Sequence, residues 1–411
     1  MGHWRPLLAT AAKMGVLLSQ HTTPFRMRSV STQEKIYSMR IGIDARLMYY
    51  SPGGIAEYTK RLVQALARLE ADEEFVILHS RKDTRQSLVD APRFRREKIW
   101  TPSHHRLEGW TLPLEVRRMG LDILHSPDFI PPTSRSFRSV ITVHDLAFLL
   151  YPHFLTEESA RFYGQIDQAV RRADHIIAVS ESTKKDTMQL LGVPERKISV
   201  IHEAANPIYK QLDREEARRR LAETYELPEH FILFVSTLEP RKNITALLQA
   251  YYQLIDDYKL PHKLVLAGRK GWLFDDVFNT VSRLKIEDDC IFLGRVPLEH
   301  LPYLYNAAEA LVHPAFYEGF GLPPLEAMAC GTPVVVSNVS ALPEIVGDAG
   351  LLADPNDVEE LEVAIYRALT DTDLRETMIE RGLKRAALFS WERAARETLE
   401  VYRQVAATHG Q

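Results

Sequence analysis

The chain has 411 residues, 45% of them hydrophobic and 26% charged, which is typical of globular proteins with sizeable cores. This length favours two or three domains over one. The chain has 51 basic and 55 acidic residues, so its net charge of −4 excludes a general electrostatic signal for nucleic-acid binding.

Residues 1–38 differ from the rest of the chain. They hold no acidic residue before Glu34, and Lys13 interrupts the apolar run from Pro6 to Leu18. A secretory signal needs a cleaner apolar core, and a spanning helix needs about 20 apolar residues. We therefore expect a disordered or mis-started extension, with Met39 opening the fold; a weak membrane-touching segment is the alternative.

From Arg40 onward, short β-branched runs alternate with helical patterns, which indicates βα units and parallel sheets. One helix is predicted where Ile55, Tyr58, Leu62 and Leu66 recur at the helical period. The strands expected in the first half are Arg40–Ala45, Phe75–His79, Ile123–His125, Ser139–Val143, His175–Val179 and Ser199–His202.

A second series of strands follows at Phe231–Ser236, Lys263–Ala267, Cys290–Leu293, Ala310–His313, Pro333–Ser337 and Gly350–Ala353. Two series predict two doubly wound α/β domains. We place the boundary within Asn206–Arg214, giving an N-terminal domain at 39–208 and a C-terminal domain at 209–388. Residues 389–411 are expected to form a helix that returns to the first domain.

The stretch Arg81–Arg118 holds ten Lys/Arg and five Asp/Glu, interspersed with Trp100, Trp110 and several leucines. One interpretation is a solvated, irregular face of the first domain. The other is a surface that meets an anionic membrane or a lipid-linked acceptor.

The most informative segment runs from Phe316 to Pro333 and includes Glu318-Gly-Phe320-Gly321-Leu322-Pro-Pro-Leu-Glu326. It follows a predicted strand and opens a helix, with Pro323 and Pro324 suited to the first helical positions. Helix-start amides and the helix dipole favour an anion such as a diphosphate. The two glutamates would repel phosphate, so we expect them to accept hydrogen bonds from sugar or ribose hydroxyls.

Glu318 and Glu326, eight residues apart, resemble the E-x7-E signature of the retaining family 4 glycosyltransferases, whose fold is GT-B, with two Rossmann-like domains. The resemblance extends from Arg40 to Val405. It includes Gly53-Gly54, Thr142-Val-His144-Asp145, Leu238-Glu-Pro-Arg241-Lys242-Asn243 and Phe389-Ser-Trp391-Glu.

On the donor side, the resemblance assigns Glu318 to the donor sugar and Glu326 to the ribose. It assigns the backbone of Phe320, Gly321 and Leu322 to diphosphate or sugar. Arg241 and Lys242 would neutralise the departing nucleotide diphosphate. Many family members have an arginine where this chain has Thr237, so Arg241 is expected to assume part of that role. Arg295 and Val296 are candidates for contacts with the base.

On the other side of the site, the resemblance places His144 near the donor sugar's 6-hydroxyl and Asp145 on the acceptor side. Gly53 and Gly54 would let a loop approach phosphate or acceptor. The chain shows no Asp-x-Asp pattern suited to a metal, so the cations would act without cofactor or metal. The resemblance implies retention at the anomeric carbon by front-face attack.

Rival functions are a glycoside hydrolase with Glu318 and Glu326 as its paired carboxylates, a nucleotide-sugar epimerase, and a non-catalytic nucleotide-sugar sensor. The Ser-Thr-Leu-Glu-Pro-Arg-Lys-Asn form resembles bacterial mannosyltransferases of polysaccharide assembly. GDP-mannose is therefore the first donor candidate and a UDP-hexose the second, with a glycan or lipid-linked acceptor. The two cysteines, Cys290 and Cys330, lie in apolar stretches and are expected to be buried free thiols. We expect a cytoplasmic protein, with a peripheral contact to the inner face of the membrane as a further possibility.

Overall fold

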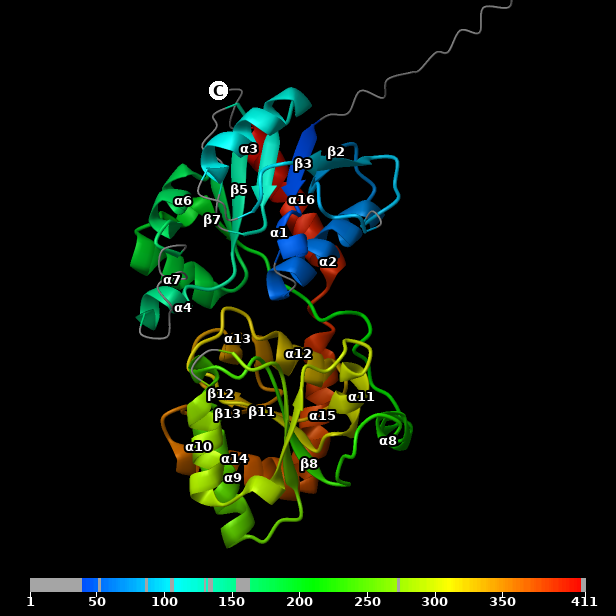
Figure 1. The fold of residues 1–411 in the computed structure, drawn as a ribbon, viewed down its shortest axis with the longest axis vertical. Coiled ribbons are helices and arrows are strands. Elements are labelled where there is room, and N and C mark those ends of the chain that lie inside the picture. Colours follow the sequence, from blue (N-terminus) through cyan, green and yellow to red (C-terminus); the bar gives the residue numbers. More distant parts are fainter. Residues whose placement is uncertain are drawn as a thin grey trace, which may run out of the picture. The chain divides into compact units, whose positions relative to one another are not determined.

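The structure is a computed structural model, and the extension expected at residues 1–38 lies outside its described residues. The described residues are 39–50, 53–85, 88–103, 107–128, 131, 136–152, 163–271 and 274–407. They form two parallel sheets, each with helices packed on both faces, so the predicted pair of doubly wound α/β domains is confirmed (Figure 1).

The N-terminal sheet has seven parallel strands in the order β3-β2-β1-β4-β5-β6-β7. Chain order reverses on the two sides of β1, so the β1–β4 junction is a topological switch point, where such sheets open a crevice at their carboxyl edge. The strands are β1 (Arg40–Asp44), β2 (Glu74–Ser80), β3 (Phe94–Ile99), β4 (Ile123–Ser126), β5 (Arg138–Val143), β6 (His175–Ala178) and β7 (Ile198–Val200).

The C-terminal sheet has six parallel strands in the order β10-β9-β8-β11-β12-β13, with its switch point between β8 and β11. Successive β8 residues, such as Leu233 and Phe234, enter cores on opposite faces. This is the period-two alternation of a strand covered on both sides. The strands are β8 (Phe231–Val235), β9 (Lys263–Ala267), β10 (Cys290–Gly294), β11 (Ala310–His313), β12 (Val334–Ser337) and β13 (Leu351–Ala353).

Helices follow most strands, as βα units require. In the first half they are α1 (Leu47–Tyr50), α2 (Gly54–Arg68), α3 (Glu108–Val116), α4 (Ala147–Leu150), α6 (Ile166–Arg172) and α7 (Glu181–Leu191). In the second half they are α8 (Arg214–Ala222), α9 (Ile244–Asp257), α10 (Asp275–Leu284), α11 (Leu301–Ala307), α12 (Leu322–Ala329), α13 (Leu342–Val346), α14 (Val358–Thr370), α15 (Thr372–Ala386) and α16 (Trp391–Ala407).

Strand β3 is the one strand that the sequence pattern did not predict. Its residues, Phe-Arg-Arg-Glu-Lys-Ile, lie in the stretch Arg81–Arg118, so the interpretation of that stretch as irregular is wrong at β3 and at α3. Among the described residues, β3 is the edge strand of the N-terminal sheet, and charged side chains commonly protect the open side of such a strand. Phe94 anchors it by stacking on Phe75 of β2, with ring centroids 4.7 Å apart.

The last helix, α16, lies beside α2 in the N-terminal domain (Figure 1). A buried polar chain holds it there: the Tyr402 hydroxyl is 2.6 Å from His125 Nδ1, and His125 Nε2 is 2.9 Å from Thr142 Oγ1. Burial lowers the pKa of His125 to about 3, so its ring is neutral and can donate from one nitrogen while accepting at the other. The chain's two halves are therefore tied together by satisfied polar contacts as well as apolar packing.

Candidate active site

Gly321 and two prolines define the start of α12. Gly321 is the N-cap residue with φ +105°, a conformation that L side chains rarely adopt. Leu322 is the first helical residue, and Pro323 and Pro324 follow it. Because proline has no N–H, the first turn presents fewer free amides than an ordinary helix start. The expected anion site at this helix is therefore reduced to the amides around Gly321 and Leu322.

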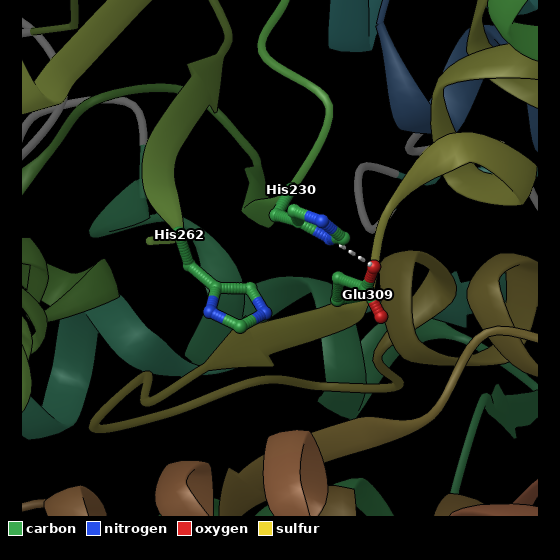
Figure 2. Close-up of side chains that lie close together, drawn as sticks. All are labelled: His230, His262 and Glu309. Atoms are coloured by element: carbon green, nitrogen blue, oxygen red, sulfur yellow. Dashed lines mark hydrogen bonds and ion pairs between the residues drawn. The ribbon is translucent and has the colours of Figure 1, made fainter. Parts of the chain in front are cut away.

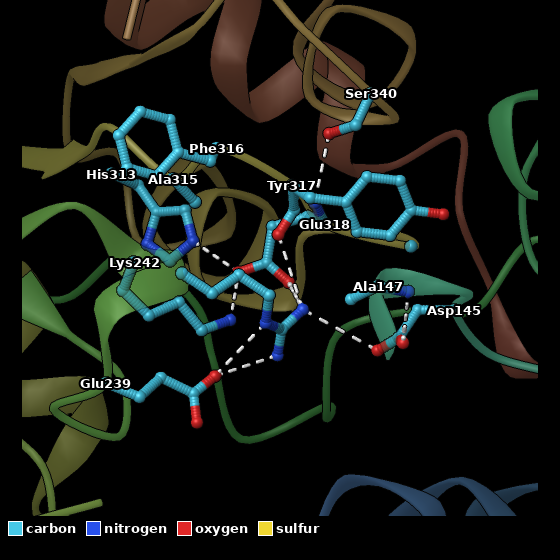
Figure 3. Close-up of polar contacts among 12 residues, drawn as sticks. Asp145, Ala147, Glu239, Lys242, His313, Ala315, Phe316, Tyr317, Glu318 and Ser340 are labelled. Atoms are coloured by element: carbon cyan, nitrogen blue, oxygen red, sulfur yellow. Dashed lines mark hydrogen bonds and ion pairs between the residues drawn. The ribbon is translucent and has the colours of Figure 1, made fainter. Parts of the chain in front are cut away.

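Glu318 lies just before this turn, in the middle of a buried charged cluster (Figure 3). Its Oε1 accepts hydrogen bonds from Lys242 Nζ and, at 2.7 Å, from His313 Nε2, while its Oε2 is 3.7 Å from Arg241. Burial alone would raise the pKa of Glu318, but the two cations and the His313 hydrogen bond hold it well below its usual range. Glu318 is therefore an ionised acceptor, and the pattern of a protonated catalytic acid does not fit it.

Arg241 is shared by three carboxylates. Its guanidinium lies 3.0 Å from Glu239, 3.6 Å from Asp145 and 3.7 Å from Glu318. Burial lowers the pKa of His313 and leaves that ring neutral. Two cations, Arg241 and Lys242, thus face three carboxylates, and the cluster has a formal charge of −1. A diphosphate would be attracted only if the cations exchanged partners or further cations joined them.

Further cations do lie at the same sheet edge. Arg269 and Lys270 follow β9, and Arg295 follows β10; all three are exposed. Gly268 and Gly271 let this loop lie against the residues that follow β8, because a Cβ at Gly268 would stand 1.7 Å from the Ser236 carbonyl oxygen. Of these three cations only Arg295 was predicted from the sequence, although Arg269 and Lys270 also lie directly after a strand.

Val296, the other candidate for a base contact, packs its side chain into the C-terminal core. Phe320 is also buried, with its ring 6.0 Å from His202 and 5.9 Å from Phe389. Both side chains are thus engaged in packing. Only their backbone groups remain to meet a ligand, which is the role that the resemblance gives Phe320.

Glu326, on α12, has a different environment from Glu318. The Tyr305 hydroxyl donates to its Oε2 at 2.8 Å, and Tyr209 also hydrogen-bonds to it. Burial dominates and raises the pKa of Glu326 to about 7, against the opposing effect of the two tyrosines. The two glutamates of one motif thus have opposite electrostatics: Glu318 is surrounded by cations, and Glu326 by phenols.

His144 stands at the end of β5, and both of its ring nitrogens are engaged. Nδ1 is 2.8 Å from Glu203 Oε1 and Nε2 is 2.9 Å from the Pro127 carbonyl oxygen. Both partners are acceptors, so both nitrogens must donate and the ring is an imidazolium. Burial opposes this, but the hydrogen bond and charge of Glu203 raise the pKa of His144 overall. To contact a donor sugar, the ring would have to exchange its bond to Pro127.

Gly319 brings the two domains into contact. A Cβ at this position would lie 1.8 Å from the His144 carbonyl oxygen and 2.8 Å from Asp145 Cβ. The Gly319 carbonyl oxygen also accepts hydrogen bonds from Ser180 Oγ at 2.6 Å and Thr183 Oγ1 at 3.1 Å. In the structure, this glycine allows the backbone of one domain to approach the backbone of the other.

Glu344 makes a second contact between the domains. Its carboxylate accepts from the amides of Glu181 and Ser182, the first residues of α7, and lies 2.6 Å from His202 Nε2. A carboxylate at a helix N-terminus is stabilised by free amides and by the helix dipole. Glu344 therefore caps a helix of the other domain.

The carboxyl edge of the N-terminal sheet holds a second set of charges. Buried Arg46 donates to both oxygens of Asp44 and pairs with Glu108 of α3. A small polar pocket lies here, lined by Asp44, Glu108, Ser126 and Asp128 among others. None of these was singled out from the sequence, because Asp44 and Glu108 meet only through the fold.

Gly53 and Gly54 begin α2, with Gly53 as its N-cap. A Cβ on either would meet nothing within 4 Å, so their backbone faces open space. The expected approach of phosphate or acceptor at this helix start remains a prediction.

His230, His262 and Glu309 form a possible metal-binding group at the opposite, amino edge of the C-terminal sheet (Figure 2). His230 Nδ1 is 3.0 Å from Glu309, but Arg214 and Arg375 also pair with that carboxylate, at 2.6 and 2.8 Å. Despite burial, these partners lower the pKa of Glu309 to about 2. Two guanidinium groups on one carboxylate would repel a divalent cation, so we interpret this cluster as a charged anchor for α8 and α15.

Within the described part of the chain, no helix combines the length and apolarity needed to cross a membrane. Cys290 and Cys330 are both buried and unpaired.

Comparison with known families matches both halves of the chain. "Glycosyltransferase Family 4" matches residues 52–207, and "Glycosyl transferases group 1" matches residues 213–385. Among curated proteins, the O-antigen chain mannosyltransferase B of Escherichia coli is 35% identical over 385 residues, which cover 89% of this chain and all of that protein.

Solved structures with a similar fold include sucrose-phosphate synthase from Thermosynechococcus elongatus, with a TM-score of 0.73 and 24% identity, covering 90% of this chain and 100% of that one. Another is WaaG, a glycosyltransferase of lipopolysaccharide biosynthesis, with a TM-score of 0.68 and 16% identity, covering 88% and 99%. The GT-B fold expected from the sequence is thereby confirmed.

Proposed function

Because this chain belongs to family 4 of the glycosyltransferases, we propose that it transfers a mannosyl residue from GDP-mannose to a glycan or lipid-linked acceptor. The observation that carries this proposal is the cluster of Glu318, Lys242 and Arg241 beside the start of α12. The relative that is 35% identical, an O-antigen chain mannosyltransferase, supports mannose as the sugar and polysaccharide assembly as the process.

In this proposal the donor's diphosphate lies at the carboxyl edge of the C-terminal sheet, near the amides of Gly321 and Leu322. Lys242 and Arg241 turn from the carboxylates toward the phosphates, and exposed Arg269 adds positive charge. These cations replace a bound metal in offsetting the charge that grows on the leaving group. Neither a cofactor nor a metal is needed for the step.

Glu318, released from part of its ion pairing, accepts hydrogen bonds from the sugar hydroxyls. Its low pKa keeps it ionised at neutral pH, so it orients the sugar and stabilises positive charge at the anomeric carbon. Glu326 accepts from the ribose, and Arg295 with the Val296 backbone contacts the base. His144 and Asp145, on the N-terminal side, lie next to the sugar and the acceptor.

The transfer we propose retains the anomeric configuration. The bond between the anomeric carbon and the diphosphate oxygen breaks, and the acceptor oxygen forms its bond to the same face. The acceptor proton passes to the departing phosphate oxygen, leaving GDP and the mannosylated acceptor. Contact between the domains at Gly319 supports exclusion of water from this step.

We place the reaction in the cytoplasm, with a peripheral contact to the inner face of the membrane, where a lipid-linked acceptor would be reached. A UDP-hexose donor is the alternative within the same family. An epimerase, a hydrolase using Glu318 and Glu326, and a non-catalytic sensor are the more distant alternatives.

A donor panel tests the proposal directly. We expect GDP-mannose to raise the melting temperature of the purified chain more than UDP-glucose, UDP-N-acetylglucosamine or GDP-glucose at equal concentration, since a ligand that binds the folded state stabilises it. NMR of the product then reports the anomeric configuration. A shift with a UDP-sugar alone would identify the alternative donor, and free mannose released without acceptor would indicate hydrolysis. No shift with any nucleotide-sugar would contradict the whole proposal.

A further inference from the structure

The outer side of α3 is unusually apolar for a surface helix. Among the described residues, Trp110, Leu114 and Trp100 are the most exposed large hydrophobic side chains, at 73%, 72% and 66%. Leu107, at the N-cap of α3, is exposed as well. Isolated exposed leucines are common, but several large apolar side chains exposed along one helix and the strand end beside it usually mark an interaction surface.

Helical spacing places these residues together. At about 100° per residue, Leu107, Trp110 and Leu114 fall within an arc of about 60°. Leu112 and Val116 fall on the opposite side and are buried in the N-terminal core. The helix thus has two apolar faces, of which the protein's own core covers one.

Trp100, which follows β3, lies beside α3. Its backbone amide donates to Glu115 of α3 at 2.7 Å, which holds the end of β3 against the helix. The Arg81 guanidinium lies 4.0 Å from the centre of the Trp100 ring. An exposed indole ring with a guanidinium stacked on it presents an apolar surface beside a positive charge.

The charge around the patch is positive. Arg81, Lys82 and Lys98 are exposed near Trp100, and Arg117 and Arg118 are exposed directly after α3. The stretch from residue 81 to 118 holds ten basic and five acidic residues in a chain whose net charge is −4. Tryptophan and leucine flanked by arginines match the boundary of a bilayer, where apolar groups enter the headgroup region and cations meet anionic lipids.

We propose that the α3 surface, defined as Trp100, Leu107, Trp110 and Leu114 with Arg81, Arg117 and Arg118, docks the enzyme on a bilayer that contains anionic lipid. The inner side of the same helix supplies Glu108, which pairs with buried Arg46 and lines the polar pocket beside Asp44 and Ser126. Docking therefore brings the N-terminal sheet's carboxyl edge close to the lipid surface. This makes a lipid-linked glycan the acceptor, a step that rests on the proposed function.

Vesicle co-sedimentation of the full chain tests the docking surface without any sugar chemistry. We expect binding to phosphatidylglycerol vesicles to be at least tenfold stronger than to phosphatidylcholine vesicles, and to weaken with salt. The double variant W110S/L114S is expected to lose at least tenfold in binding. Arg117→Gln and Arg118→Gln are each expected to lose about fivefold, the effect of one cation at an anionic surface.

The matched control is V363S/L388S, which removes two exposed hydrophobic side chains elsewhere on the chain, at 50% and 57% exposure. It is expected to bind vesicles as the unaltered chain does. Unchanged melting temperatures, and an unchanged thermal shift with GDP-mannose, show that each variant is folded and that donor binding is intact.

Equal binding to both kinds of vesicle, or no binding to either, would overturn the proposal. So would a W110S/L114S variant that binds vesicles normally, or one whose only change is in oligomeric state, which would identify a protein partner for this surface. Each of these results can occur while donor binding stands, so the proposed transferase function is judged separately.

Discussion

The carboxyl edges of the two sheets carry different chemistry. The C-terminal edge holds Arg241 and Lys242, with Arg269, Lys270 and Arg295 exposed around them. The N-terminal edge holds two buried sets of paired charges, Arg46 with Asp44 and Glu108 and His144 with Glu203, and exposed Arg81 and Lys82 directly after β2. In the proposed function, the anionic donor binds at the first edge and the acceptor at the second.

The difference shows how one architecture can serve two ligands. Both edges lie at topological switch points of parallel sheets, so the fold offers two equivalent crevices. In the proposed function, their selectivity follows from the charged groups that each edge presents. The two edges meet at Arg241, because its guanidinium lies within 3.7 Å of both Asp145 of the N-terminal domain and Glu318 of the C-terminal domain.

Removing a cation from the C-terminal edge is expected to have the largest effect on activity. We expect Lys242→Met to lower kcat by about 10²–10³ because a preorganised charge beside the leaving group is lost. The variant also leaves buried Glu318 with fewer partners, so its melting temperature falls. The measurements are steady-state kinetics at saturating donor, and thermal unfolding.

The double variant K242M/E318Q separates the two effects. It removes the carboxylate that has lost a partner, so we expect the melting temperature to recover, while kcat stays low because Lys242 and Glu318 are both proposed to act on the donor. Recovery of activity in the double variant would show that Lys242 acts only by stabilising Glu318, and that the charge at this edge is not used on the donor.

Gly319→Ala tests the contact between the edges. Its Cβ would stand 1.8 Å from the His144 carbonyl oxygen, so backbone must move. We expect a loss of about 1–3 kcal/mol in the free energy of unfolding, as overpacking usually causes, with reduced transfer activity. Gly54→Ala is the matched control, because its Cβ meets nothing within 4 Å and alanine favours a helix. Equal melting temperatures for the two variants would show that the domains do not need this approach.

The smallest expected effect is a pH dependence at Glu326. The pKa of Glu326 is raised to about 7 in the folded chain because burial penalises its ionised form. Folding is therefore more favourable when the Glu326 carboxyl group is protonated. The resulting stability is complete below the ordinary glutamate pKa and is lost as pH rises through about 7. Glu326→Gln cannot ionise and so does not lose this stability. The melting temperature of the variant minus that of the unaltered chain is therefore expected to increase between about pH 5 and about pH 8.

Donor binding gives the opposite trend at the same residue. A ribose hydroxyl donates more strongly to a carboxylate than to a neutral carboxyl group. GDP-mannose affinity of the unaltered chain is therefore expected to rise as pH passes through about 7, the pKa of Glu326, and the Gln variant to show a flat profile. A calorimetric titration at several pH values measures this; parallel profiles for the two proteins would remove Glu326 from the ribose site.

Local pattern was enough to predict most of the fold. Twelve of the thirteen strands follow from apolar runs between turn signals, because strands buried on both faces must be apolar throughout. The exception, β3, is an edge strand whose charged residues protect its open side and hide it from such a pattern. The site motifs at Arg241-Lys242 and Glu318–Glu326 were also visible, since each is contiguous and follows a strand.

By itself, then, the sequence determined the two α/β domains, the glycosyltransferase family and the residues nearest the donor. Only the tertiary structure decided their electrostatic states. His144 is an imidazolium because Glu203 and Pro127, 59 and 17 residues away, both accept from it. Glu318 and Glu326 lie in one motif yet differ in pKa, because partners from distant strands and helices surround them. Protonation depends on the charges and solvent around a group, and the fold brings these together from across the chain.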